Sequence, residues 1–228
     1  VYLSYRAVDK LIVTLRASHA NLSTKDSKYG DFSDYVAANP YDSPYDEQGN
    51  LRSSLSYNMN NPLYEASLNS FTKSESRTQT ISLDARYNFK PELYVTAQGA
   101  YSTVRSTSEA YISPASNKYA TTTALSQKGS YLLENGGTET SSAKLVGNWI
   151  HKFDDEGTMF TLNLGGEIKR SNTWDRYMTA SGFLSDDLAD IAYATSYSIS
   201  SLPGGSEELS TSVGAFAAAN FIWKNRYV

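Results

Sequence analysis

A strict alternation of apolar and polar side chains constrains this chain more than any other feature. It is clearest in "TQTISLDARYNFKPELYVTAQGAYS", residues 78–102, where Ile81, Leu83 and Ala85 alternate with Ser82, Asp84 and Arg86. The alternation pauses at Lys90-Pro91-Glu92 and then resumes. A period of two places the apolar side chains on one face of a strand and the polar ones on the other. The two faces must therefore meet different surroundings, either a dry core and water or lipid and a wet lumen.

The same pattern recurs along the whole chain and predicts an all-β fold. Six long alternating segments occupy residues 10–23, 78–89, 93–105, 142–153, 158–170 and 209–223, with partial ones at 1–6 and 226–228. The segments are bounded by turn-forming residues, as antiparallel strands are.

The connections between these segments alternate between short and long. Turns of a few residues, such as "KPE" and "DDEG", alternate with the stretches 24–77, 106–141 and 171–208, which are rich in Ser, Thr, Asn, Asp, Gly and Tyr. In an up-and-down sheet, this order places every short turn at one end and every long loop at the other. Transmembrane β-barrels have this asymmetry, whereas structureless loops of such length are uncommon in compact soluble domains.

Composition agrees with a sheet that has one apolar and one polar face. The apolar fraction is 40%, and the most apolar run, residues 213–223, is interrupted by Asn220, so no segment approaches the ~20 residues of a membrane helix. The net charge of −4 is spread along the chain and does not favour nucleic-acid binding. The absence of cysteine excludes disulfides and thiolate metal sites.

Aromatic residues concentrate at the predicted short-turn end, and most of them share the apolar parity. Rings gathered at one end of every hairpin are typical of the aromatic girdle of an outer-membrane barrel. The residues are Tyr5, Tyr87, Phe89, Tyr94, Trp149, Phe153, Phe160, Phe221, Trp223 and Tyr227.

These patterns predict an antiparallel up-and-down transmembrane β-barrel segment, with about seven or eight strands of a larger barrel. Residues 1–228 would form part of a single barrel domain, with short periplasmic turns, long extracellular loops and no plug domain. Leu83, Ala85, Tyr87, Val95 and Ala97 are expected to face lipid. Ser82, Asp84, Arg86, Thr96 and Gln98 are expected to line a wet lumen. Because the sequence begins in mid-strand and stops just after a turn, we expect it to be a fragment.

Several segments, in order, resemble the barrel of SusC/RagA-type TonB-dependent transporters. They are "AANPYDSPYDEQGNL" (37–51), "NNPLYEA" (60–66), "YNFKPELYVTAQGAYS" (87–102), "GTMFTLNLGGEIKRS" (157–171) and "ANFIWKNRYV" (219–228). The resemblance implies an importer in the cell outer membrane of Bacteroidota-like bacteria, with the lipid bilayer around it. It also implies oligosaccharide or peptide cargo, a SusD-like substrate-binding lipoprotein as a lid, and energy from TonB. No segment resembles the plug or the part that contacts TonB.

Aromatic residues of the predicted outer loops are the candidate ligand contacts, because flat rings stack on sugars or clamp peptides. The candidates are Tyr41, Tyr45, Trp174 and Tyr177. The alternative is that such rings pack the loops together or touch a partner protein. The segment 183–196 is expected to form a short helix capped by Ser185.

Other functional classes have little support. Asp42, Asp46 and Glu47 lack the regular spacing of a calcium loop and fit a solvated turn better. No GxSxG, HExxH or phosphate-loop motif occurs, so neither an enzyme nor a cofactor is predicted. A surface-exposed or secreted β-domain with a binding or structural role, and no transport, is the alternative function.

Overall fold

The computed structural model describes residues 1–154, 157–198 and 202–224, which form one antiparallel sheet of eight strands. Seven strands follow one another in space, from β1 to β6 and then β8, and the short β7 pairs with the end of β6. The strands are β1 (Tyr2–Val8), β2 (Leu11–Lys25), β3 (Phe71–Lys90), β4 (Leu93–Ile112), β5 (Ser130–Lys152), β6 (Met159–Ser181), β7 (Ser196–Tyr197) and β8 (Gly204–Ile222). The up-and-down antiparallel architecture expected from the alternation is confirmed. The strand expected at 226–228 and the ring of Tyr227 lie outside the described residues.

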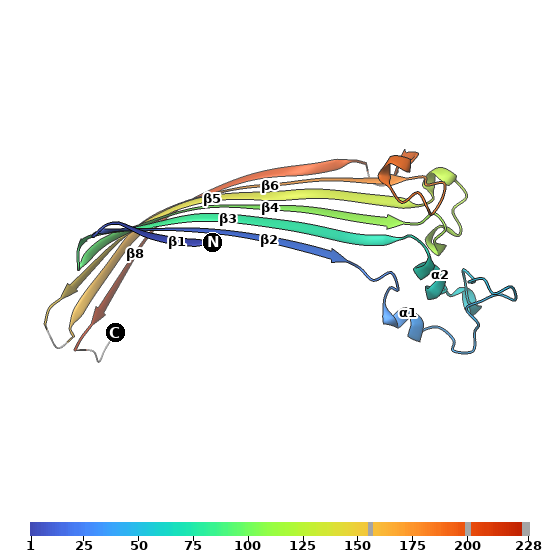
Figure 1. Cartoon of the computed structure of the whole chain (residues 1–228), viewed down its shortest axis with the longest axis horizontal. Helices are drawn as coiled ribbons and strands as arrows, with labels where there is room; N and C mark the ends of the chain where they lie inside the picture. The colour runs from blue at the N-terminus through green and yellow to red at the C-terminus, as the bar shows by residue number, and fades with distance from the viewer. Residues whose placement is uncertain (155–156, 199–201, 225–228) are drawn as a thin grey trace.

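Short and long connections lie at opposite ends of the sheet (Figure 1). The connections β1–β2, β3–β4 and β5–β6 lie at one end, and the connections β2–β3, β4–β5 and β6–β8 lie at the other. This is the asymmetry that the sequence predicts.

The strands are longer, and the loops shorter, than the alternation indicated. β5 and β6 have 23 residues each, so much of the sequence assigned to the loops 24–77, 106–141 and 171–208 is strand. The reason is visible in β3, where Lys73, Glu75 and Arg77 alternate with Ser74 and Ser76. Both faces of the strand are polar there, so the sequence shows no alternation of apolar and polar residues from which the strand could be predicted.

On this sheet the apolar side chains are more exposed than their polar neighbours, the reverse of what a soluble domain shows. On β3 the apolar Leu83 is 50% exposed, and on β5 Leu145 is 56% exposed. The polar neighbours Ser82 and Asp84 are less exposed than Leu83. We call the side that carries these leucines the band face and the opposite side the polar face. Leu83 and Leu145 are therefore not part of a dry sandwich interior.

The apolar side chains of the band face form a continuous band across the strands. Register aligns Leu11 with Tyr87, Val95, Gly147, Leu164 and Ala217, in one row from β2 to β8. The band ends abruptly toward the long loops: the row of Ala17, Ile81 and Tyr101 continues into Ser141 and Arg170.

Aromatic rings border the band on its short-turn side and contact one another across strands. The Trp149 and Phe160 ring centroids are 6.1 Å apart, and those of Phe153 and Phe221 are 6.2 Å apart. His151 lies between Trp149 and Phe153 at 5.7 and 4.6 Å. Tyr94 is an exception, because it belongs to the polar-face parity and lies under Arg86 at 3.8 Å.

Helical structure is confined to the connections. The first contains α1 (Phe32–Val36), α2 (Pro62–Ser67) and a 3₁₀ turn, η1 (Ser56–Asn58); other 3₁₀ turns are η2 (Asn117–Tyr119), η3 (Leu125–Gln127) and η4 (Ile191–Tyr193). The α-helix expected over 183–196 is absent, because Ser185 and its neighbours form turns that pack onto the sheet instead. Among the described residues, no helix has the length and apolarity needed to cross a membrane.

Candidate functional site

The three long connections form a cap at one end of the sheet, in which hydrogen bonds join the connections to one another. The third connection is also held on the sheet by a buried phenylalanine. Phe183 is 1% exposed and packs edge-on against Tyr111 of β4, with ring centroids 5.2 Å apart. Tyr131 and Ala180 complete this cluster, and Phe71 borders it. Since these strand residues have the band-face parity, the segment around Phe183 folds back over the band-face side of the strand ends. Burial in this cluster raises the pKa of Tyr111 to about 12 and also raises that of Tyr131. We name the cluster the Phe183 anchor.

A glutamate of α2 joins the first connection to the second. The Glu65 carboxylate accepts hydrogen bonds from the Ser116 hydroxyl and the Asn117 backbone N–H, both at 2.8 Å. The Tyr64 hydroxyl donates to the Ala115 carbonyl at 3.2 Å. Charge-assisted bonds of this kind fix two loops in one relative position.

The first connection also contacts the third. The Asp186 carboxylate accepts from the Asn69 backbone N–H at 3.1 Å, and the Asn69 side chain donates to the Asp186 carbonyl. All three connections thus hold one another, and the cap is a structured surface built on the ends of the strands.

Asn61 organises the interior of the first connection. It is 1% exposed, and its side-chain amide donates to the carbonyls of Pro44 and Arg52 at 2.9 and 2.7 Å. Its Oδ1 accepts from the Leu63 N–H, which caps α2 ahead of Pro62. Asn61 was not among the candidates from sequence, although Asn followed by Pro is a recognisable helix start.

The acidic stretch of the first connection forms a turn. The Asp46 carboxylate accepts from the backbone N–H groups of Asn50 and Gln48 at 2.8 and 3.0 Å. The hydrogen bond from the Asn50 backbone lowers the pKa of Asp46, with smaller contributions from the Asn50 side chain and Gln48. Asp42 binds the Ser56 hydroxyl instead. Within residues 1–154, 157–198 and 202–224, no group of three or more His, Asp or Glu side chains could hold a metal ion.

Exposed aromatic side chains cover the first connection. Tyr41 is 94% exposed and Tyr57 is 96% exposed, whereas Tyr45 is half-exposed and pairs with Leu51 in an isolated bridge. Tyr57 has a φ of 60°, a left-handed conformation that is uncommon for a tyrosine. Large apolar rings fully open to solvent are typical of contact surfaces. The set is Tyr29, Phe32, Tyr41 and Tyr57.

The other two candidate contacts lie in a strand and not in a loop. Trp174 and Tyr177 both belong to β6, on opposite parities. Trp174 is on the band face, where its ring lies 5.2 Å from the Arg105 guanidinium. Tyr177 is on the polar face, in a depression of about 330 Å³ with Ser106, Ser108, Glu134 and Asp175. The structure therefore brings the four candidates to three different surfaces.

Charge on the polar face is divided along the strands. Near the short turns, Arg16 pairs with Asp84 at 3.0 Å and Lys144 Nζ lies 5.1 Å from the Phe216 ring. Toward the cap, the acidic residues of this parity are Glu134, Asp175 and Glu208. The polar face between these two regions carries hydroxyl groups that hydrogen bond across strands, such as Thr80 with Ser102 and Thr140 with Ser171. Such a surface is suited to contact with water and polar groups.

Comparison with known proteins identifies the fold. No protein-family model and no curated protein matches the chain. The chain is similar to solved structures of the RagAB peptide importer in the "closed-closed" state (TM-score 0.70, 18% identity, 96% of this chain) and the "open-open" state (0.72, 17%, 98%). It is also similar to a structure of the RagAB peptide transporter, with a TM-score of 0.70 and 17% sequence identity over 98% of this chain. The chain spans 25% of the length of each of these solved chains. It thus has the fold of part of a transporter β-barrel.

Proposed function

We propose that this chain forms part of the wall and extracellular cap of an active nutrient importer in the bacterial outer membrane. The observation that carries the proposal is the exposed apolar band, bordered by aromatic rings on one side and charged rows on the other. In water such a band would be unfavourable, whereas acyl chains are its ordinary surroundings in a barrel. The band contains about the number of residues per strand that a tilted membrane strand needs, ~9–11.

The open edges of the sheet support a larger closed barrel. Among the described residues, β1 pairs only with β2, and β8 pairs only with β6. Unpaired backbone groups in hydrocarbon are costly, so both edges need further strands. In the complete protein the polar face would then surround a wet lumen.

The cargo we propose is a peptide or an oligosaccharide, recognised by the cap and admitted along the polar face. The similarity to a peptide importer supports the first of these. Following the SusC/RagA resemblance, we propose a SusD-like lipoprotein as the partner above the cap, and TonB as the energy source through segments other than these. We propose transport rather than catalysis.

Cell fractionation and uptake test this proposal. The intact protein should sediment with the outer membrane, and replacement of residues 26–70 by a short Gly/Ser linker should abolish growth on the transported nutrient. Surface labelling should verify that the shortened protein still inserts. Recovery of the intact protein in the soluble fraction would instead favour the surface or secreted β-domain without transport.

A further inference from the structure

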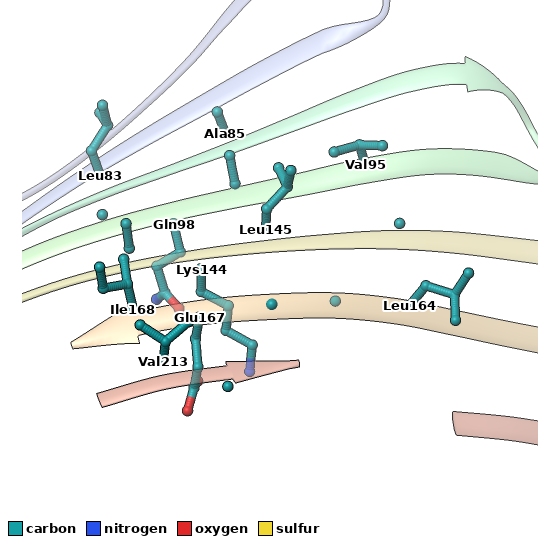
Figure 2. Close-up of a pocket in the computed structure, with 17 residues that line it drawn as sticks. Leu83, Ala85, Val95, Gln98, Lys144, Leu145, Leu164, Glu167, Ile168 and Val213 are labelled. Atoms are coloured by element: carbon teal, nitrogen blue, oxygen red, sulfur yellow. The ribbon is translucent and has the colours of Figure 1, made fainter. Parts of the chain in front are cut away.

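A groove crosses the middle of the band face. It has a volume of about 940 Å³, and its floor includes the small residues Gly99, Ala143, Gly147 and Gly166. Leu83 and Leu145 rise beside it, while the side chains of Lys144 and Glu167 extend to the other side of the sheet (Figure 2). Because the floor positions carry almost no side chain, they leave an open hollow that larger residues such as Leu83 and Leu145 border.

A second, polar depression of about 400 Å³ lies on the same strands next to the groove. The groove and the depression adjoin along the strands: on β4, Gly99 lines the groove and Tyr101 lines the depression, and on β6, Ile168 lines the groove and Arg170 lines the depression. The residues that line this depression include Tyr101, Glu139, Ser141, Arg170, Asn172 and Glu207. It therefore lies at the boundary where the apolar band ends.

Arg170 is the cation that lines this depression, and it forms no salt bridge among the described residues. Across the part of the chain that the structure describes, no acidic side chain pairs with its guanidinium. The two carboxylates nearby are already engaged: Glu139 with Arg105, and Glu207 with Asn172 at 3.0 Å and Arg176 at 3.8 Å. Arg170 is thus available to an anionic group from outside the chain.

We propose that the groove and Arg170 together bind one phosphate-bearing glycolipid of the outer leaflet. An acyl chain occupies the groove, and the lipid phosphate receives hydrogen bonds from the Arg170 guanidinium, which matches phosphate geometry. Tyr101 lies in the same row as Arg170, at the depth where amphipathic rings border a bilayer. This inference rests on the proposed membrane location.

Native mass spectrometry of the intact, detergent-purified protein with added lipid A tests the site. The wild type should retain one lipid A, and Arg170→Gln should weaken retention at least about tenfold, as expected for loss of a charge-assisted contact. Gly99→Leu should weaken it similarly by filling the groove, since a Cβ at Gly99 meets nothing within 4 Å and the variant should fold. Arg77→Gln is the matched control, because Arg77 is on the band face but already pairs with Glu75 at 3.7 Å.

Dephosphorylated lipid A should bind wild type and Arg170→Gln equally. Retention of lipid A by Arg170→Gln at the wild-type level would overturn the site. If the protein fractionates with the outer membrane and supports uptake in that case, only the lipid site is refuted. If it is found in the soluble fraction, the proposed function fails as well.

Discussion

Trp174 and Tyr177 lie on opposite faces of β6, although they are close in sequence. Trp174 is half-buried on the band face against Arg105, and Tyr177 is 43% exposed on the polar face beside Glu134. In a closed barrel only one of these faces meets the lumen.

Substitution of these two rings should therefore affect transport differently. Tyr177→Ala is expected to lower uptake, by about tenfold for the loss of ~1.4 kcal/mol of cargo contact. Trp174→Ala is the matched control and should leave uptake within about twofold, because its ring faces away from the polar side. Initial uptake rates at equal surface expression give the comparison. Equal loss in both variants would contradict a polar-face route.

An arginine should be tolerated on one side of the sheet and not on the other. Leu83→Arg is expected to destabilise the membrane-inserted barrel by about 1–2 kcal/mol, between the cost of an arginine at the bilayer midplane and its cost near the interface, because Leu83 lies one row inside the edge of the band. Ala100→Arg lies at nearly the same level but on the polar face, beside Ser82 and Ser142, and should cost much less. Urea unfolding in lipid vesicles measures both values. Similar costs would mean that the band face does not meet lipid.

A side chain at Gly165 should destabilise the fold, because Phe216 of the adjacent strand β8 occupies the space beside it. A Cβ there would collide with the Phe216 ring and lie 2.9 Å from the Leu145 carbonyl oxygen. Gly165→Ala is therefore expected to destabilise the fold by about 1–3 kcal/mol, as overpacking does. Gly99→Ala is the control, since open space surrounds that position. The temperature at which electrophoretic mobility shifts to the unfolded form reports both.

Phe183 should determine whether the third connection stays on the sheet. Phe183→Ala removes one of the two most buried rings of the Phe183 anchor, and a deletion of this size costs about 3–5 kcal/mol. We expect proteases to cleave within residues 182–198 of the variant while the strands remain intact. The adjacent Leu184 is 70% exposed, and Leu184→Ala should be cleaved no faster than wild type.

Asn61 should hold the first connection in its folded form. Asn61→Ala removes the amide that donates to the carbonyls of Pro44 and Arg52, and only the Pro44 carbonyl keeps another donor, the Arg52 N–H; the expected cost is about 1–3 kcal/mol. Faster amide hydrogen exchange across residues 42–63 is the expected result. Asn60→Ala changes an exposed side chain and serves as the control. Unchanged exchange in Asn61→Ala would show that other contacts hold this loop.

The sequence by itself determined the antiparallel strands, the face of each side chain in the band and the end at which the long loops lie. These follow from local chemistry, because a period of two and a turn between two strands are both readable within a few residues. Asp84 and Leu83 were assigned to their faces in this way.

Only the tertiary structure decided where the strands end and what the loops do. Beyond the band both faces are polar, so Arg77 and Trp174 gave no sign that they belong to strands. The Phe183 anchor and the bond between Asp186 and Asn69 join residues far apart in the chain, and no local pattern encodes such pairs. The groove beside Arg170 is likewise a product of register, which aligns small residues from several strands in one place.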